Sequence, residues 1–201
     1  YIPEILVQQQ EAIIATGSNN SARYFKYYFG KYPHIIRKNR TSCAVLNGQE
    51  SLESLTALGN DVLAYFGLGC RNVSQVYLPQ GASMEPLIQA LQPASEVAVA
   101  NHKYANNYEY NRSVYLLNME PYLDNGSLLF RESGGLFAPG AVLFYRFYRD
   151  HEELKSLLAE KQADLQCVVS ENAWWEGSIP FGKAQLPEVT DYADGVDTMQ
   201  F

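Results

Sequence analysis

The alternation of strand and helix patterns along the chain constrains its fold more than any other feature of the sequence. Short apolar runs bounded by turn residues indicate strands, and apolar residues spaced three and four apart indicate helices. The strand patterns cover residues 12–15, 74–79, 96–102, 141–148 and 165–170, and residues 35–48 form an extended segment whose second half is expected to be buried. The helical patterns cover residues 18–30, 50–66, 82–92 and 151–162. This order predicts an α/β fold in which helices cover a sheet.

Two segments fit neither pattern. Residues 103–118 are polar and rich in Tyr and Asn, so we expect a polar approach to a further strand. Residues 124–140 form the most loop-like stretch, in which Asn125-Gly126 favours a hairpin turn.

The composition sets limits on what the chain can bind. Its 201 residues are 47% hydrophobic, which is enough to build the core of one large domain or two small ones. Fifteen Lys and Arg residues against 22 Asp and Glu residues give a net charge of -7 without any basic run, so nucleic acid is not an expected partner. No apolar run approaches the roughly 20 residues that a membrane-spanning helix needs, so no membrane span is expected.

Three cysteines lie far apart, without the spacing of a zinc site or a disulfide framework. This usage favours a reducing compartment, and we expect a cytoplasmic protein that holds no metal. Cys43 and Cys167 fall in apolar strands, where a cysteine is usually a small buried residue.

Cys70 differs from the other two, because it lies in a glycine-rich bend beside Arg71, in the stretch YFGLGCRNVSQVYLP. Exposure and a neighbouring positive charge lower the pKa of a thiol, so Cys70 is a candidate nucleophile, although it can equally be a space-filling residue. His102 is the histidine that could act as its base in a cysteine hydrolase.

The turn Thr16-Gly17-Ser18 joins the first strand pattern to the first helical pattern. It can be a plain turn, but a glycine turn before a helix also presents free N–H groups to a phosphate. The residues alone leave both interpretations open.

The order of segments resembles the second half of the aldehyde dehydrogenase superfamily. Family members carry a TGS turn and helix, then ELGGKSP with a strand, a helix, GQxC with a strand, EIFGP and PFGG. The counterparts here read ATGSNNSARYF, IRKNRTSCAVL, GLGCRNVSQVYLP, GGLFAPGAVL and PFGKAQLPEVTDYADGVDTMQF. The wording RKNRTS, NHKYANNYEYN and YLDNG is most similar to the acyl-CoA reductases of the luminescence (LuxC-like) fatty acid reductase group.

The resemblance implies a fold, a cofactor and a set of site residues. It implies an aldehyde-dehydrogenase-like catalytic domain, with a helix-covered, mostly parallel sheet, joined to the tail end of a Rossmann-type cofactor domain. NADPH or NADH would be the cofactor, an acyl-CoA or acyl-protein thioester the substrate, and the full-length protein a homo-oligomer. The implied site comprises Cys70 as nucleophile, Thr16, Gly17, Ser18 and Phe137 at the cofactor, and Phe181 on the acyl side.

Three departures from the family pattern qualify this assignment. Aligning Ser42 with the motif's Ser puts Arg37 where the oxidising members have the Glu that activates water. Gly135 occupies the acidic position of EIFGP, where Glu132 could substitute. The first half of the family has no counterpart, so the chain resembles a C-terminal fragment.

The resemblance divides the chain into residues 1–36 of the cofactor domain, a catalytic domain at 37–170 and an active-site and association segment at 171–201. We expect the parent protein to reduce fatty acyl-CoA to aldehyde with NAD(P)H, through a thioester on Cys70, and this fragment alone to be inactive. The alternatives are a cysteine-dependent acyl hydrolase or acyltransferase that uses Cys70 with His102, and a non-catalytic interaction domain.

Overall fold

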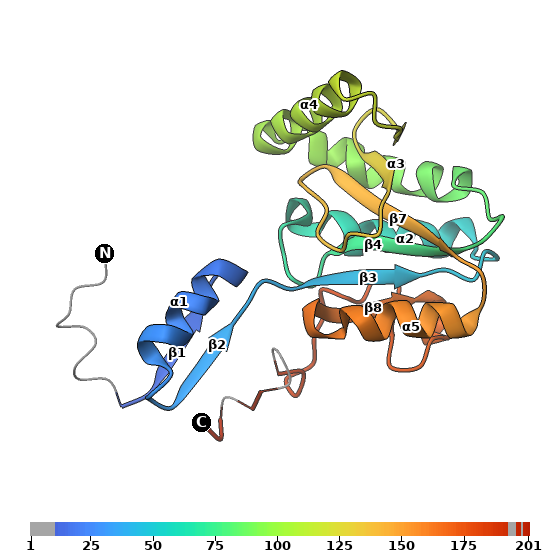
Figure 1. Ribbon diagram of the computed structural model, residues 1–201. Coiled ribbons are helices and arrows are strands. Elements are labelled where there is room, and N and C mark those ends of the chain that lie inside the picture. Colours follow the sequence, from blue (N-terminus) through green and yellow to red (C-terminus); the bar gives the residue numbers. More distant parts are fainter. Residues whose placement is uncertain (1–10, 193–195, 198) are drawn as a thin grey trace.

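The computed structural model describes residues 11–192, 196–197 and 199–201. Residues 1–10, 193–195 and 198, which belong to the first and third domains expected above, lie outside the described residues. The described chain forms a two-stranded sheet with one helix and a seven-stranded sheet with four α-helices (Figure 1).

The small unit contains the first three elements of the chain. These are β1 (Ile13–Thr16), α1 (Asn19–Phe29) and β2 (His34–Arg37). The two strands are parallel, and α1 begins at Ser18, whose hydroxyl oxygen accepts a hydrogen bond from the backbone N–H of Ser21. Figure 1 shows this unit set beside the large sheet, to which the chain between β2 and β3 connects it.

The large sheet has the strand order β5-β6-β7-β4-β3-β8-β9. Its strands are β3 (Thr41–Val45), β4 (Val73–Pro79), β5 (Leu123–Asp124), β6 (Leu129–Glu132), β7 (Val142–Tyr148), β8 (Leu165–Ser170) and β9 (Ile179–Pro180). All neighbouring strands are parallel except β5 and β6, which pair in antiparallel register. The sheet therefore confirms the expected mostly parallel α/β architecture.

Helices cover both faces of the large sheet. The main core packs α2 (Leu52–Leu63), α3 (Glu85–Val99) and α4 (His102–Leu117) against one face, and α5 (His151–Lys161) packs on the other. The alternation of side chains along β3 sets this division, because Ala44 belongs to the first cluster and Cys43 and Val45 belong to the second. Short 3-10 turns complete the chain at η2 (Ala64–Gly67), η3 (Gln162–Asp164) and η4 (Glu171–Ala173).

Two helices cover most of the stretch from 96 to 118, so two expectations from the sequence are wrong. The predicted strand at 96–102 is mostly the end of α3, and the predicted polar approach at 103–118 is α4. The buried stripe of α4 consists of Tyr104, Tyr108, Asn111 and Tyr115, which recur at helical spacing but are read as polar on a hydropathy scale. Asn101 caps α4 and separates the two helices.

The other patterns are confirmed in part. The segment 35–48 is divided between β2 and β3, which belong to different sheets, and α2 ends at Leu63, before the predicted end at 66. α3 continues to Val99, beyond the predicted end at 92. Strands occur within 74–79, 141–148 and 165–170, and α5 begins after Asp150, whose side chain accepts a hydrogen bond from the backbone N–H of Glu153. No helix among the described residues is both long and apolar enough to cross a membrane.

Candidate functional site

Cys70 lies in a bend that we call the cysteine bend, residues 64–72, between α2 and β4. Its side chain is exposed. Tyr65 and Phe66 have φ angles of +52° and +61°, in the left-handed region that side chains other than glycine rarely occupy. Such conformations cost about 1–3 kcal/mol each and persist where the surroundings impose them, often at functional sites.

Asn72 is the residue that holds the cysteine bend in place. Its side chain is 1% exposed, and its Oδ1 accepts a hydrogen bond of 2.7 Å from the backbone N–H of Gly69. Its Nδ2 donates to the carbonyl oxygens of three residues at the end of α2, namely Asp61, Val62 and Ala64. A Cβ on Gly69 would lie 2.8 Å from Asn72 Oδ1, so glycine is needed for this contact. Asn72 therefore satisfies the last carbonyls of α2 and fixes the loop that carries Cys70.

Asp61 joins the same helix end to the C-terminal segment. Its carboxylate is fully buried and accepts hydrogen bonds from the backbone N–H groups of Gly182, at 2.6 Å, and Ala184, at 3.0 Å. Burial raises the pKa of Asp61 to about 6, and the two backbone hydrogen bonds oppose this rise. Arg71 completes the connection, because its Nε donates to the carbonyl oxygen of Ala184.

Cys43 and Cys167 are less accessible than Cys70. Cys43 is completely buried, and burial raises the pKa of its thiol far above the ordinary value. Cys167 is half-buried, and burial raises the pKa of its thiol too. Ser42 Oγ lies 3.1 Å from Cys167 Sγ and donates to the Cys70 carbonyl oxygen, also at 3.1 Å. Cys70 is therefore the one exposed thiol of the chain.

The turn Thr16-Gly17-Ser18 lies in the small unit, between β1 and α1. The backbone N–H of Gly17 donates to the carbonyl oxygen of Arg37 at 3.2 Å. A Cβ on Gly17 would lie 2.8 Å from the Cβ of Ser21, so the turn requires glycine for the close approach of α1.

The other predicted site residues lie in different surroundings. Phe137 is 39% exposed in the loop between β6 and β7, whereas Phe181 is 8% exposed and packs in the main core. His102 is exposed in the first turn of α4, and within the described chain no hydrogen bond joins it to Cys70. Among the described residues, no three His, Cys, Asp or Glu side chains gather as a metal-holding group.

Two residues that hold the site together were not predicted from the sequence: Asn72, which fixes the cysteine bend, and Asp61, which joins α2 to the C-terminal segment. The sequence contains only a weak indication of their roles. Asn72 follows Cys70 by two residues, as a polar residue between the bend and a buried strand, and Asp61 interrupts the apolar stripe of α2.

Comparison with known proteins identifies the fold. No family model and no curated protein matches the sequence. Among solved structures, the NAD-dependent aldehyde dehydrogenase of Sinorhizobium meliloti matches with a TM-score of 0.61 at 11% identity, covering 83% of this chain and 40% of that one. The indole-3-acetaldehyde dehydrogenase AldA of P. syringae, solved with NAD+ and IAA, matches with a TM-score of 0.59 at 10% identity, covering 87% of this chain and 42% of that one.

The 1-pyrroline-5-carboxylate dehydrogenase of Thermus thermophilus matches with a TM-score of 0.58 at 13% identity, covering 82% of this chain and 39% of that one. The chain therefore has an aldehyde-dehydrogenase-like fold and spans about two fifths of the length of these structures.

Proposed function

We propose that this chain is the catalytic part of an acyl-CoA reductase that makes aldehydes with NADPH or NADH through a thioester on Cys70. The observation that carries the proposal is the placement of Cys70: an exposed thiol in a strained bend, fixed by the buried Asn72, in an aldehyde-dehydrogenase-like fold. The assignment to the LuxC-like group and the preference for fatty acyl substrates rest on the sequence resemblance.

The nucleophilic step uses groups of the cysteine bend. The Cys70 thiolate attacks the thioester carbonyl, a C–S bond forms to Cys70, and the bond to the CoA sulfur breaks so that CoA leaves as its thiol after protonation. The backbone N–H of Cys70 is bonded to no acceptor within the described chain, so it is free to stabilise the oxyanion of the tetrahedral intermediate. Asn72 contributes by holding the bend in one conformation.

The small unit fits the phosphate end of a nicotinamide cofactor. The turn at Gly17 leaves no room for a Cβ, and the first backbone N–H groups of α1 follow directly, an arrangement that suits an anion. The phosphates of the cofactor would lie beside Thr16, Gly17 and Ser18. Phe137 would lie near the other end of the cofactor. When bound, the cofactor supplies the two electrons and the hydrogen that convert the thioester to aldehyde.

Arg37 accounts for the reductive direction in this proposal. It ends β2, and the resemblance aligns it with the residue that activates water in the oxidising members. A guanidinium cannot accept a proton near neutral pH, so the thioester on Cys70 persists until it is reduced. The net reaction consumes one acyl-CoA, one NAD(P)H and one proton, and yields one aldehyde, one CoA and one NAD(P)+.

The division of the chain follows from the same proposal. We assign residues 1–36 to the cofactor domain, 37–170 to the catalytic domain and 171–201 to the active-site and association segment, with Phe181 on the acyl side. The full-length protein would be a cytoplasmic homo-oligomer. In the structure, the chain between the two sheets is residues 38–40, just after the first boundary.

The test is an assay of NAD(P)H oxidation by the full-length protein with acyl-CoA substrates of increasing chain length. We expect aldehyde and CoA in equal amounts, and a loss of at least about 10³-fold in rate for Cys70→Ala, because no other exposed thiol replaces the nucleophile. Release of free acid without cofactor oxidation would instead support the hydrolase alternative, and His102→Ala would then abolish acylation.

A further inference from the structure

A cavity of about 720 Å³, which we call the basic groove, is lined mostly by the small unit, together with Lys38, Arg40 and Val196. Five of the residues that line it are basic, namely Arg23, Lys26, His34, Lys38 and Arg40. The volume lies in the range of pockets that hold small organic ligands, which is roughly 300–1,000 Å³.

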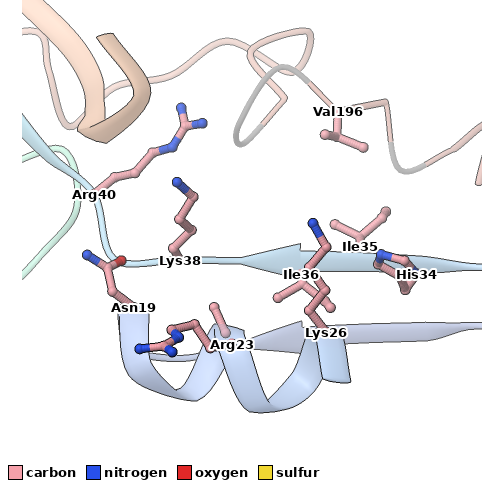
Figure 2. Close-up of a pocket in the computed structure, with 10 residues that line it drawn as sticks. Asn19, Arg23, Lys26, His34, Ile35, Ile36, Lys38, Arg40 and Val196 are labelled. Carbon is pink, nitrogen blue, oxygen red and sulfur yellow. The ribbon is translucent and has the colours of Figure 1, made fainter. Parts of the chain in front are cut away.

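The basic side chains come from α1, from β2 and from the residues that follow β2. Arg23 and Lys26 are three residues apart in α1 and therefore share one face of the helix. His34 and Lys38 are an even number of residues apart, which places them on the same side of extended chain. Figure 2 shows Lys26, Lys38 and Arg40 extending to the same side of the strand, the side on which Val196 lies.

Three of the basic side chains in the groove, those of Arg23, Lys26 and Lys38, have no acidic partner among residues 11–192, 196–197 and 199–201. This concentration of positive charge contrasts with the net charge of -7 for the whole chain. A concave surface lined by one sign of charge attracts ligands of the opposite sign, here an anion with several charges.

The groove also has an apolar component. Ala22, Ile35, Ile36 and Val196 line it together with the basic residues. Apolar side chains beside several cations suit a ligand that combines a flat apolar ring with more than one phosphate, as a phosphorylated nucleotide does. A small inorganic anion would use the cations alone and leave most of this volume unfilled.

We propose that the basic groove binds an adenosine bisphosphate group, supplied by the phosphorylated end of the acyl-CoA substrate. The identification of the source rests on the proposed function, whereas the chemistry of the group rests on the groove itself. Lys26 and Lys38 bind the phosphates, and the apolar part of the groove contacts the adenosine.

The experiment is a calorimetric titration of the full-length protein with three probes: adenosine 3′,5′-bisphosphate, which is the end of CoA; adenosine 2′,5′-bisphosphate, which is the end of NADPH; and inorganic pyrophosphate. We expect the 3′,5′-bisphosphate to bind most tightly, and its affinity to fall as salt is raised. Tighter binding of the 2′,5′-bisphosphate, or equal binding of pyrophosphate, would overturn the assignment to CoA.

The variant Lys26→Gln/Lys38→Gln should weaken binding of the 3′,5′-bisphosphate by about tenfold or more, because each lysine supplies a charge-assisted hydrogen bond. The matched control is Lys103→Gln/Lys155→Gln, which removes two exposed lysines from other helices and should leave the affinity unchanged. Equal affinity of the groove variant and the parent would refute the proposal.

Activity measurements separate this inference from the proposed function. The groove variant should raise KM for acyl-CoA and leave KM for the acyl-pantetheine thioester, which lacks the nucleotide, unchanged. If the parent reduces acyl-CoA while the groove variant binds and reacts normally, the groove inference fails and the reductase survives. If the parent reduces no acyl-CoA yet binds the bisphosphate through these lysines, the reductase and the CoA source fail, and the nucleotide site remains.

Discussion

The small unit and the large sheet bury very different amounts of apolar surface. None of the residues of α1 is buried, and three of its tyrosines are exposed, whereas α2 alone buries six residues against α3 and the sheet. In the large sheet, Leu58, Phe130 and Leu143 are completely inaccessible to solvent. A two-stranded sheet with one helix has little core of its own, while seven strands covered on both faces support themselves.

The difference indicates how the site is built. The cysteine bend belongs to the large sheet, where Asn72 binds it to the end of α2 and Arg71 binds it to the C-terminal segment. The glycine turn and most of the residues that line the basic groove belong to the small unit. The nucleophile thus lies on the well-packed part of the chain, and the proposed phosphate-binding groups lie on the part with less packing.

Substitutions in the two units should differ most strongly in how far they lower the free energy of unfolding. Leu58→Ala removes a fully buried side chain from the main core, and we expect it to lower the free energy of unfolding by about 2–5 kcal/mol. Phe25→Ala in α1 removes a half-buried ring and should leave the main transition within about 0.5 kcal/mol of the parent. Urea denaturation of the chain measures the free energy of unfolding of both variants. If Phe25→Ala moves the main transition as far as Leu58→Ala does, the two units unfold together and the comparison is wrong.

Arg37 tests whether the small unit contributes to the chemistry, because it ends β2 at the point where the chain leaves this unit. In the full-length protein, Arg37→Glu should raise hydrolysis of the thioester on Cys70 by about 10²-fold, since a positioned carboxylate activates water. The hydrolysis rate is measured as the rate at which free acid is released after a single acylation of Cys70. The control is Arg37→Gln, which removes the charge without adding a base. An equal rise in both variants, or in neither, would mean that Arg37 does not occupy the position of the general base.

Substitution of Asp61 should have a smaller effect on stability, confined to the large sheet and its helices. Asp61→Ala leaves the backbone N–H groups of Gly182 and Ala184 unpaired and should cost about 1–3 kcal/mol. Because the pKa of Asp61 is raised to about 6 in the folded protein, its contribution to stability is greatest below about pH 4 and falls as the pH rises to 6. Denaturation at pH 4.5 and pH 7 should therefore show a larger difference between parent and variant at the lower pH. A difference that grows with pH would mean that burial does not dominate the ionisation of Asp61.

The sequence predicts the elements whose buried face is aliphatic and whose ends carry a turn or cap residue. Examples are the strands β4 and β8, and the helix α5, which is capped by Asp150. The sequence fails at α4, because its buried residues are tyrosines and an asparagine, and packing against the sheet rather than hydropathy makes them internal. α3 continues through Pro93, which a pattern analysis reads as a helix end.

The candidate site was predictable only where neighbouring residues in the sequence mark it. Cys70 stands out because glycines flank its bend, and glycine marks positions with unusual backbone geometry. Asn72 and Asp61 act through backbone groups that are distant in sequence, such as Gly182, and no local pattern indicates such contacts. Phe181 was predicted from the resemblance, and its burial in the core is a property of the tertiary packing.

The most direct test of the proposed chemistry is mass spectrometry of the full-length protein mixed with acyl-CoA in the absence of cofactor. The account predicts one acyl group per chain, attached to Cys70, which disappears with release of aldehyde when NADPH or NADH is added. Cys70→Ala should carry no acyl group. An acyl group on Cys167 or Cys43, or an acylated Cys70 that releases only free acid when the cofactor is added, would contradict it.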